Sequence, residues 1–304
     1  MASAPFPRLL GEALAVALAM AAPVAAQDAP PREIAHELGE TRIEGRPERV
    51  VALEFSFVQA LDTLGAGPVG IADDQRPERI EQLLGKTIEY QSVGTRLEPN
   101  LEVLSTLHPD LIIADERRHA AIYPQLSAIA PTIVLNSWDG SYQDIKNAVV
   151  TIADALGERE AGEAAVAAHE ARIAAVAEAV PDDDERRFLL AVATPESWSL
   201  HTASSFSGSV FEAIGVTPAV GNGLPVESAV GLERLVAVNP DVLLVGVDPG
   251  VTAYDAAQGN AAWEAISAVQ AGLVVRVDRN RFARFRDLNT AELIANQVLA
   301  LGAE

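Results

Sequence analysis

Five arginines gather near the carboxyl end of a chain that is otherwise strongly acidic. The segment VVRVDRNRFARFRD carries Arg276, Arg279, Arg281, Arg284 and Arg286, whereas the 304 residues together have a formal net charge of −21. A guanidinium presents a planar fork of N–H donors that matches a carboxylate, so this cluster could bind a polycarboxylate anion. Salt screens distant acidic residues beyond about 10 Å, which leaves a local arginine pocket effective. The alternative is a solvated surface whose arginines pair with nearby Asp and Glu.

Two further basic sites lie in the first half of the chain, each near the end of a predicted strand. They are Arg96, within VGTR, and the run Arg117-Arg118-His119. His119 could donate a hydrogen bond to an anion, or it could be an ordinary surface histidine. The five histidines show none of the spacings typical of metal sites, so we expect no metal-ligating residues.

A repeated stretch supplies two acidic side chains at equivalent positions. LEVLSTLHPDLIIAD begins at Leu101 and LERLVAVNPDVLLVG begins at Leu232, and each pattern predicts a short helix, a Pro-Asp break and a buried strand. Glu102 and Glu233 fall in the first helical turn, where a carboxylate stabilises the helix dipole by roughly 0.3–1 kcal/mol. The alternative is that each half of the protein presents one acidic side chain to a two-fold symmetric partner.

Helical spacings and short apolar runs alternate along the chain, which predicts an α/β layer fold. We expect two Rossmann-like lobes, residues 27–140 and 182–304, joined by one long helix at 141–181. Gly157 and Gly162 mark the places where this helix could bend. The cleft between two such lobes is the expected ligand site.

The amino-terminal segment predicts export. Arg8 is followed by an apolar run, residues 13–26, that ends in small residues and is shorter than the roughly 20 residues of a spanning helix. Val24-Ala25-Ala26 fits a signal-peptidase site, which gives a signal peptide at 1–26 and a soluble periplasmic protein starting at Gln27. The alternative is a buried amino-terminal helix.

Composition and motif order disfavour several other functions. The chain has no cysteine, which excludes disulfides, thiolate metal sites and a lipid anchor on Cys, and its acidity argues against nucleic-acid binding. Residues 65–70, GAGPVG, match the dinucleotide fingerprint, but a predicted helix precedes them and a predicted strand follows, the reverse of the required order. A nucleotide-dependent enzyme using these glycines is the alternative from another class, and an exported structural protein is a third.

The stretch VGTRLEPNLEVLSTLHPDLIIAD, the long helical connection and LERLVAVNPDVLLVG resemble the periplasmic solute-binding proteins of iron-uptake ABC importers. The likeness is closest to the ferric dicitrate-binding type, through LEFSFVQAL, LIIADERRHAAIY, HTASSFSGSV and FARFR. The resemblance implies a monomeric receptor, not an enzyme, that delivers an anionic ferric chelate to an inner-membrane ABC permease dimer. Iron would travel inside the chelate, so no cofactor is expected. Another siderophore, haem or cobalamin is the alternative ligand.

The resemblance also implies roles for particular residues. Glu102 and Glu233 would dock the two lobes onto the permease. The remaining residues would line the ligand cleft, with the four arginines neutralising citrate carboxylates: Arg96, Arg118, His119, Arg284, Arg286, Ser56, Trp198 and Ser205. No catalytic residue is expected.

Overall fold

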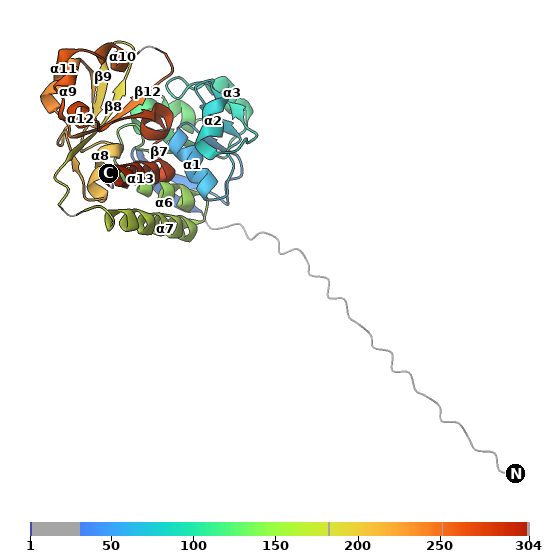
Figure 1. The fold of residues 1–304 in the computed structure, drawn as a ribbon. Coiled ribbons are helices and arrows are strands. Elements are labelled where there is room, and N and C mark those ends of the chain that lie inside the picture. Colours follow the sequence, from blue (N-terminus) through green and yellow to red (C-terminus); the bar gives the residue numbers. More distant parts are fainter. Residues whose placement is uncertain (2–30, 182, 251, 303–304) are drawn as a thin grey trace.

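Two α/β lobes lie side by side above a shared layer of helices in the computed structural model (Figure 1). The structure describes residue 1 and residues 31–181, 183–250 and 252–302. The predicted signal peptide, residues 1–26, lies outside the described residues apart from Met1. Among the helices of the described ranges, none combines the length and apolar character that crossing a bilayer requires.

The amino-terminal lobe is built on a five-stranded parallel sheet with the order β5-β4-β3-β6-β7. Its strands are β3 (Val50–Ala52), β4 (Gly70–Ile71), β5 (Gln91–Ser92), β6 (Leu111–Asp115) and β7 (Thr132–Leu135). Its helices are α1 (Phe55–Thr63), α2 (Pro77–Leu84), α3 (Leu101–Thr106), α4 (Glu116–His119), the 3-10 turn η1 (Ala120–Ile122) and α5 (Tyr123–Ser127). A hairpin of β1 (Arg32–His36) and β2 (Gly39–Ile43) adjoins β7.

The strand order of this lobe creates a crevice at one edge. The chain runs outward from β3 through β4 to β5, then crosses back to β6 and β7 on the other side. In open parallel sheets, ligands bind beyond the carboxyl ends of the strands at such a switch point. The residues that follow β3 and β6 therefore share one edge of the sheet.

The carboxyl-terminal lobe has a mixed sheet with the order β11-β9-β8-β12-β13, and β10 also pairs with β8. Its strands are β8 (Arg187–Ala193), β9 (Trp198–His201), β10 (Thr217–Pro218), β11 (Val226–Val230), β12 (Val242–Val247) and β13 (Val274–Asp278). Its helices are α8 (Phe206–Ala213), α9 (Leu232–Val238), α10 (Ala253–Ala257), α11 (Ala261–Glu264), α12 (Ser267–Gln270), the π-helical turn η2 (Asn280–Arg284) and α13 (Leu288–Gly302).

The segment predicted as one linking helix is two helices, α6 (Tyr142–Ala155) and α7 (Arg159–Ala177). Gly157 takes a left-handed φ of 77° and ends α6, and the Glu158 N–H bonds the Ala153 carbonyl at 2.7 Å. This is a Schellman motif, which reverses the chain. The helices then pack antiparallel, and a Cβ at Gly162 would lie 2.4 Å from the Ala153 side chain. The connection is a helical hairpin because the chain turns back at Gly157, whereas Gly162, the other predicted bending point, lies inside α7 and lets the two helices pack closely.

One apolar core runs through both lobes along their base. It joins residues of α1, α6, α8 and α13, among them Phe57, Ile152, Phe211 and Ile294, none more than 1% exposed. The outer face of each sheet has a separate cluster of its own. Because the shared layer is apolar and continuous, it restrains the lobes far more than a single flexible linker would.

The repeated stretches fold as predicted, and each performs the same structural task. Asp110 and Asp241 accept hydrogen bonds from the backbone N–H groups of Arg49 and Arg187, at 2.8 Å and 2.9 Å. Those N–H groups lie just before β3 and at the start of β8, so each Pro-Asp break anchors a central strand of its lobe. The Arg49 and Arg187 guanidinium groups in turn bond carbonyls at the end of α3 and α9.

The glycine-rich residues 65–70 form a helix end, as their order predicted. Gly65 has a φ of 69°, and the Ala66 N–H bonds the Leu61 carbonyl at 2.9 Å, which closes α1. β4 begins at Gly70. The helix precedes the glycines and the strand follows, so a dinucleotide fingerprint is not formed here.

Candidate functional site

A cavity of about 460 Å³ lies between the lobes, at the carboxyl ends of their parallel strands. This volume falls within the roughly 300–1,000 Å³ typical of small-molecule sites. Its walls carry an unusual density of positive charge. Seven arginines line it, and these include all four that the sequence assigned to the cleft: Arg79, Arg96, Arg117, Arg118, Arg279, Arg284 and Arg286.

Arg96 is held by two carboxylates of its own lobe. Its Nη2 and Nε bond the Asp74 Oδ2 at 2.9 Å and 3.1 Å, and its Nη1 lies 3.4 Å from both carboxylate oxygens of Glu54. Burial disfavours the charge on Arg96, but Glu54 and Asp74 outweigh it and raise the pKa of Arg96. The guanidinium also lies 4.0 Å from the Phe55 ring centroid. Arg96 is therefore a fixed cation with its donors already engaged.

Arg118 reaches the cleft from the short helix that follows β6. Its Nη1 pairs with Glu54, and its guanidinium lies 4.0 Å from the ring centroid of Trp138, a cation–π contact. Burial lowers the pKa of Arg118, and Glu54 opposes that effect. The Nε and Nη2 groups have no hydrogen-bond partner among the described residues, so they are available to an anion.

Asp115, the last residue of β6, positions both Arg118 and Trp138. Its Oδ1 accepts the Arg118 N–H at 3.0 Å, and its Oδ2 accepts the N–H groups of Ser137 and Trp138 at 3.0 Å and 2.8 Å. The side chain is fully buried. One strand-end carboxylate thus orders α4 and the loop after β7.

The carboxyl-terminal lobe contributes a second, smaller ion network. Asp248, just after β12, pairs with Arg279 and lies 3.5 Å from Arg284. Burial and the neighbouring Arg279 lower the pKa of Arg284 to about 10, so it remains a cation at neutral pH. Since the Asp248 side chain is 41% exposed, this network is more open to solvent than the one around Glu54.

Arg286 connects the two lobes. Its Nη1 donates to the carbonyls of Ser137 and Trp138 at 3.2 Å and 3.0 Å, and its guanidinium lies 4.8 Å from the Trp138 ring centroid. Its φ of 50° is uncommon for a long side chain, a strain that functional sites often hold. Burial lowers its pKa to about 10. Arg286 therefore braces the cleft as well as lining it.

His201 adds a neutral polar group to the wall. It is the last residue of β9, and its Nδ1 lies 3.1 Å from the Ser207 hydroxyl. Burial, then the charges of Arg286 and Arg279, lower its pKa to about 3. The imidazole is uncharged throughout the physiological range and does not add to the positive charge of the cleft.

The structure places His119 beneath the cleft wall instead of on it. The side chain is fully buried, and its Nδ1 accepts the Asp115 N–H at 2.9 Å. Its Nε2 donates to the Arg96 carbonyl at 2.8 Å. Both ring nitrogens are occupied, so the expected donation to an anion is replaced by a supporting role that ties Arg96 to the end of β6.

The other three expected wall residues are also buried away from the cavity. The Ser56 hydroxyl bonds that of Ser137 at 2.7 Å, and Ser205 caps α8 by accepting the Gly208 N–H at 3.0 Å. Trp198 stacks on Trp263 in the outer core of its lobe, with ring centroids 5.9 Å apart. Trp198 begins β9, a strand that the sequence patterns did not predict, and for this reason Trp198 was wrongly expected at the cleft wall.

Several residues of the cleft and of the ion pairs behind it were missed, and they share one signal. Each lies within a few residues after a parallel strand: Glu54 after β3, Asp74 after β4, Trp138 after β7 and Asp248 after β12. Such strand ends form the ligand edge of an α/β sheet. Applied to each predicted strand, this rule would have found all four.

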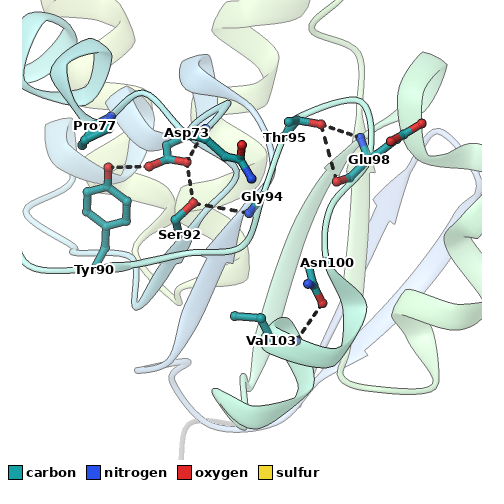
Figure 2. Close-up of a pocket in the computed structure, with 10 residues that line it drawn as sticks. Asp73, Pro77, Tyr90, Ser92, Gly94, Thr95, Glu98, Asn100 and Val103 are labelled. Carbon is teal, nitrogen blue, oxygen red and sulfur yellow. Dashed lines mark hydrogen bonds between the residues drawn. The ribbon is translucent and has the colours of Figure 1, made fainter.

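A larger cavity, about 770 Å³, opens on the surface of the amino-terminal lobe (Figure 2). In Figure 2 the buried Asp73 accepts hydrogen bonds from Tyr90 and Ser92, at 3.0 Å and 2.5 Å. The residues that line it include no arginine, lysine or histidine. Because it offers no positive charge, it suits an anion less than the inter-lobe cleft does.

Glu102 and Glu233 are exposed in the first turns of α3 and α9. Figure 1 shows these helices toward the upper end of the view, one on each lobe. Neither carboxylate forms an ion pair with a described residue, whereas the Asn100 side chain caps α3 by accepting the Glu102 and Val103 N–H groups. Helix capping in α3 thus does not depend on Glu102.

The chain belongs to the periplasmic binding protein family, whose model it matches over residues 50–280. Its relatives include the Fe(3+)-citrate-binding protein YfmC of Bacillus subtilis, 43% identical over 268 residues that cover 88% of this chain and 85% of that protein. The Fe(3+) dicitrate-binding periplasmic protein FecB of Escherichia coli is 36% identical, covering 85% of this chain and 86% of that protein.

A solved structure shares the fold at lower sequence identity. Staphylococcus aureus SirA complexed with staphyloferrin B superposes with a TM-score of 0.77, covering 88% of this chain and 97% of that one, at 22% identity. This likeness concerns the arrangement of the two lobes alone.

Proposed function

We propose that this protein is a periplasmic receptor that binds ferric citrate in the inter-lobe cleft and delivers it to an ABC importer. The observation that carries the proposal is the set of arginines from both lobes around one cavity. Guanidinium groups bind carboxylates through paired, charge-assisted hydrogen bonds, and a citrate chelate presents several carboxylates. The names of the two relatives above support this choice of ligand.

The cleft is suited to hold the chelate by its ligand groups. Arg118 of the amino-terminal lobe and Arg286 of the carboxyl-terminal lobe both lie against the Trp138 ring, and Arg284 lines the cavity from the carboxyl-terminal lobe. Within the described residues no group of three His, Asp or Glu side chains could hold a metal ion. In this proposal the iron arrives with its citrate ligands in place, and the protein contacts the citrate.

The exposed Glu102 and Glu233 are proposed to dock the lobes onto the permease. Each begins a short helix in an equivalent position of its lobe, and neither is engaged in an ion pair within the described structure. A two-fold permease dimer would offer one basic pocket to each. The signal peptide predicted at 1–26 fits a periplasmic site of action.

Calorimetric titration of the mature protein tests the proposed ligand. Ferric citrate, iron-free citrate and a ferric hydroxamate are compared at the same pH and ionic strength. We expect saturable heat with ferric citrate and none with the neutral hydroxamate, which cannot engage the arginines. Binding of the hydroxamate alone, or no heat with any citrate species, would refute the proposal.

A further inference from the structure

Glu54 is a carboxylate buried among the arginines of an anion-binding cleft. It is the N-cap residue of α1, two positions after the end of β3, and has no solvent exposure. Within the part of the chain that the structure describes, its side chain has two hydrogen-bonding partners, the guanidinium groups of Arg96 and Arg118. Burying a carboxylate is costly even when it is paired. An anion receptor would gain attraction for its ligand by replacing this residue with a neutral one, so its presence needs a reason.

Glu54 is the centre of an ordered series of charges in the amino-terminal lobe. Arg79 and Arg96 share Asp74, and Arg96 and Arg118 share Glu54. Three cations are thus balanced by two carboxylates, which leaves one positive charge in excess. Removing the Glu54 charge would double that excess.

The opposite wall shows the same excess. Arg279 and Arg284 share Asp248, again leaving one positive charge. Arg117 is neutralised by Asp139 at 2.8 Å, and Arg286 has carbonyl partners only. Seven arginines and the four carboxylates paired with them therefore leave an excess of about three positive charges, far below what the number of arginines suggests, and the buried Asp115 near Arg118 and Arg286 lowers this excess further.

We propose that Glu54 is a specificity-determining positioning residue, which holds the Arg96 and Arg118 guanidinium groups in place and limits the positive charge that the cleft offers to a chelate. The proposal rests on the function proposed above. It predicts that the receptor selects among anionic chelates by charge as well as shape. A site with full arginine charge would hold the most highly charged polycarboxylates most tightly, including free citrate.

The test separates charge from geometry with two substitutions. Glu54→Gln keeps the shape and removes the charge, whereas Glu54→Asp keeps the charge and shortens the reach. Asp62→Asn is the matched control, because Asp62 pairs with Lys86 at 2.6 Å at the far end of α1, roughly 12 Å along the helix axis from Glu54. It changes the net charge of the protein equally but outside the cleft.

Affinity for ferric citrate is measured by calorimetry between about 0.01 M and 1 M salt, where the Debye length falls from about 30 Å to 3 Å. For Glu54→Gln we expect the loss of affinity over this range to be at least about threefold greater than for wild type. Glu54→Asp should bind more weakly but with the wild-type salt dependence, and Asp62→Asn should match wild type.

The same salt dependence for Glu54→Gln and wild type would overturn the proposed role, because a purely structural residue would change affinity alone. If Glu54→Gln does not fold, Asp74→Asn removes one charge from the same series at a more exposed position and must show the steeper dependence. No ferric citrate binding by wild type would refute the proposed function, and the role of Glu54 with it. If wild type binds ferric citrate and Glu54→Gln has the same salt dependence as wild type, only the role of Glu54 is refuted.

Discussion

The substitution Arg118→Ala tests most directly how the cleft binds an anion. Arg118 lines the cavity with a side chain only 8% exposed, and Nη1 alone is engaged, by Glu54. The loss of one charge-assisted hydrogen bond from the free edge costs about 1.5–3 kcal/mol, a factor of roughly 10 to 150 in affinity. Glu54 keeps its partner Arg96, so the substitution should weaken binding before it unfolds the protein.

The assay is calorimetric titration with ferric citrate, alongside circular dichroism to confirm folding. Arg118→Lys keeps the charge but loses the planar fork and should give an intermediate loss. Arg159→Ala, an exposed arginine on α7, is the control and should bind as wild type does. Folded Arg118→Ala with an affinity within about twofold of wild type would refute the assignment of Arg118 to the ligand.

Three other outcomes follow from the structure. Ligand-dependent quenching of tryptophan fluorescence should vanish in Trp138→Phe and persist in Trp263→Phe. The reason is that Trp138 lines the cleft at 39% exposure, whereas Trp263 is buried in the core. Quenching that survives in Trp138→Phe would contradict this placement. Reversing the charge of Glu102 and Glu233 together should abolish transport in cells while calorimetric affinity is unchanged, and a loss of binding would mean that they are structural. Burial raises the folded-state pKa of Asp287 to about 6, above its usual value near 4. Between these two values the folded protein binds a proton at Asp287 that the unfolded chain has released, so the free energy of unfolding falls as pH rises from about 4 to 6. Asp287→Asn should remove a difference of about 3 kcal/mol in unfolding free energy over that window, measured by urea titration at each pH, and an unchanged pH profile would argue against a raised pKa.

The sequence predicted the arginines of the cleft but not the carboxylate that pairs with two of them. Arg96, Arg118, Arg284 and Arg286 were assigned to the cleft from family likeness, and the structure does place all four along its walls. Their contact with a ligand stays a prediction. Glu54 was missed because it stands inside an apolar run and pairs with arginines 42 and 64 residues away. The strand-end rule finds the position of Glu54, but no local pattern shows these distant partners.

The sequence by itself determined the features that depend on neighbouring residues. The repeated helix–break–strand pattern, the alternation of elements and the glycine helix end at Gly65 all follow from periodicity, capping and left-handed φ values, which act within a few residues. The return of the chain at Gly157 is equally local, although only the packing of α7 on α6 decided that it makes a hairpin.

Only the tertiary structure decided which polar side chains reach the ligand edge. His119 and Trp198 carry the same chemistry as true cleft residues, yet one is enclosed by backbone groups and the other by aromatic rings. The same holds for the charge of the cleft, which depends on carboxylates supplied by separate strand ends. Burial and ion pairing are sums over contacts made by distant parts of the chain, so they exist only once both sheets have formed and faced each other.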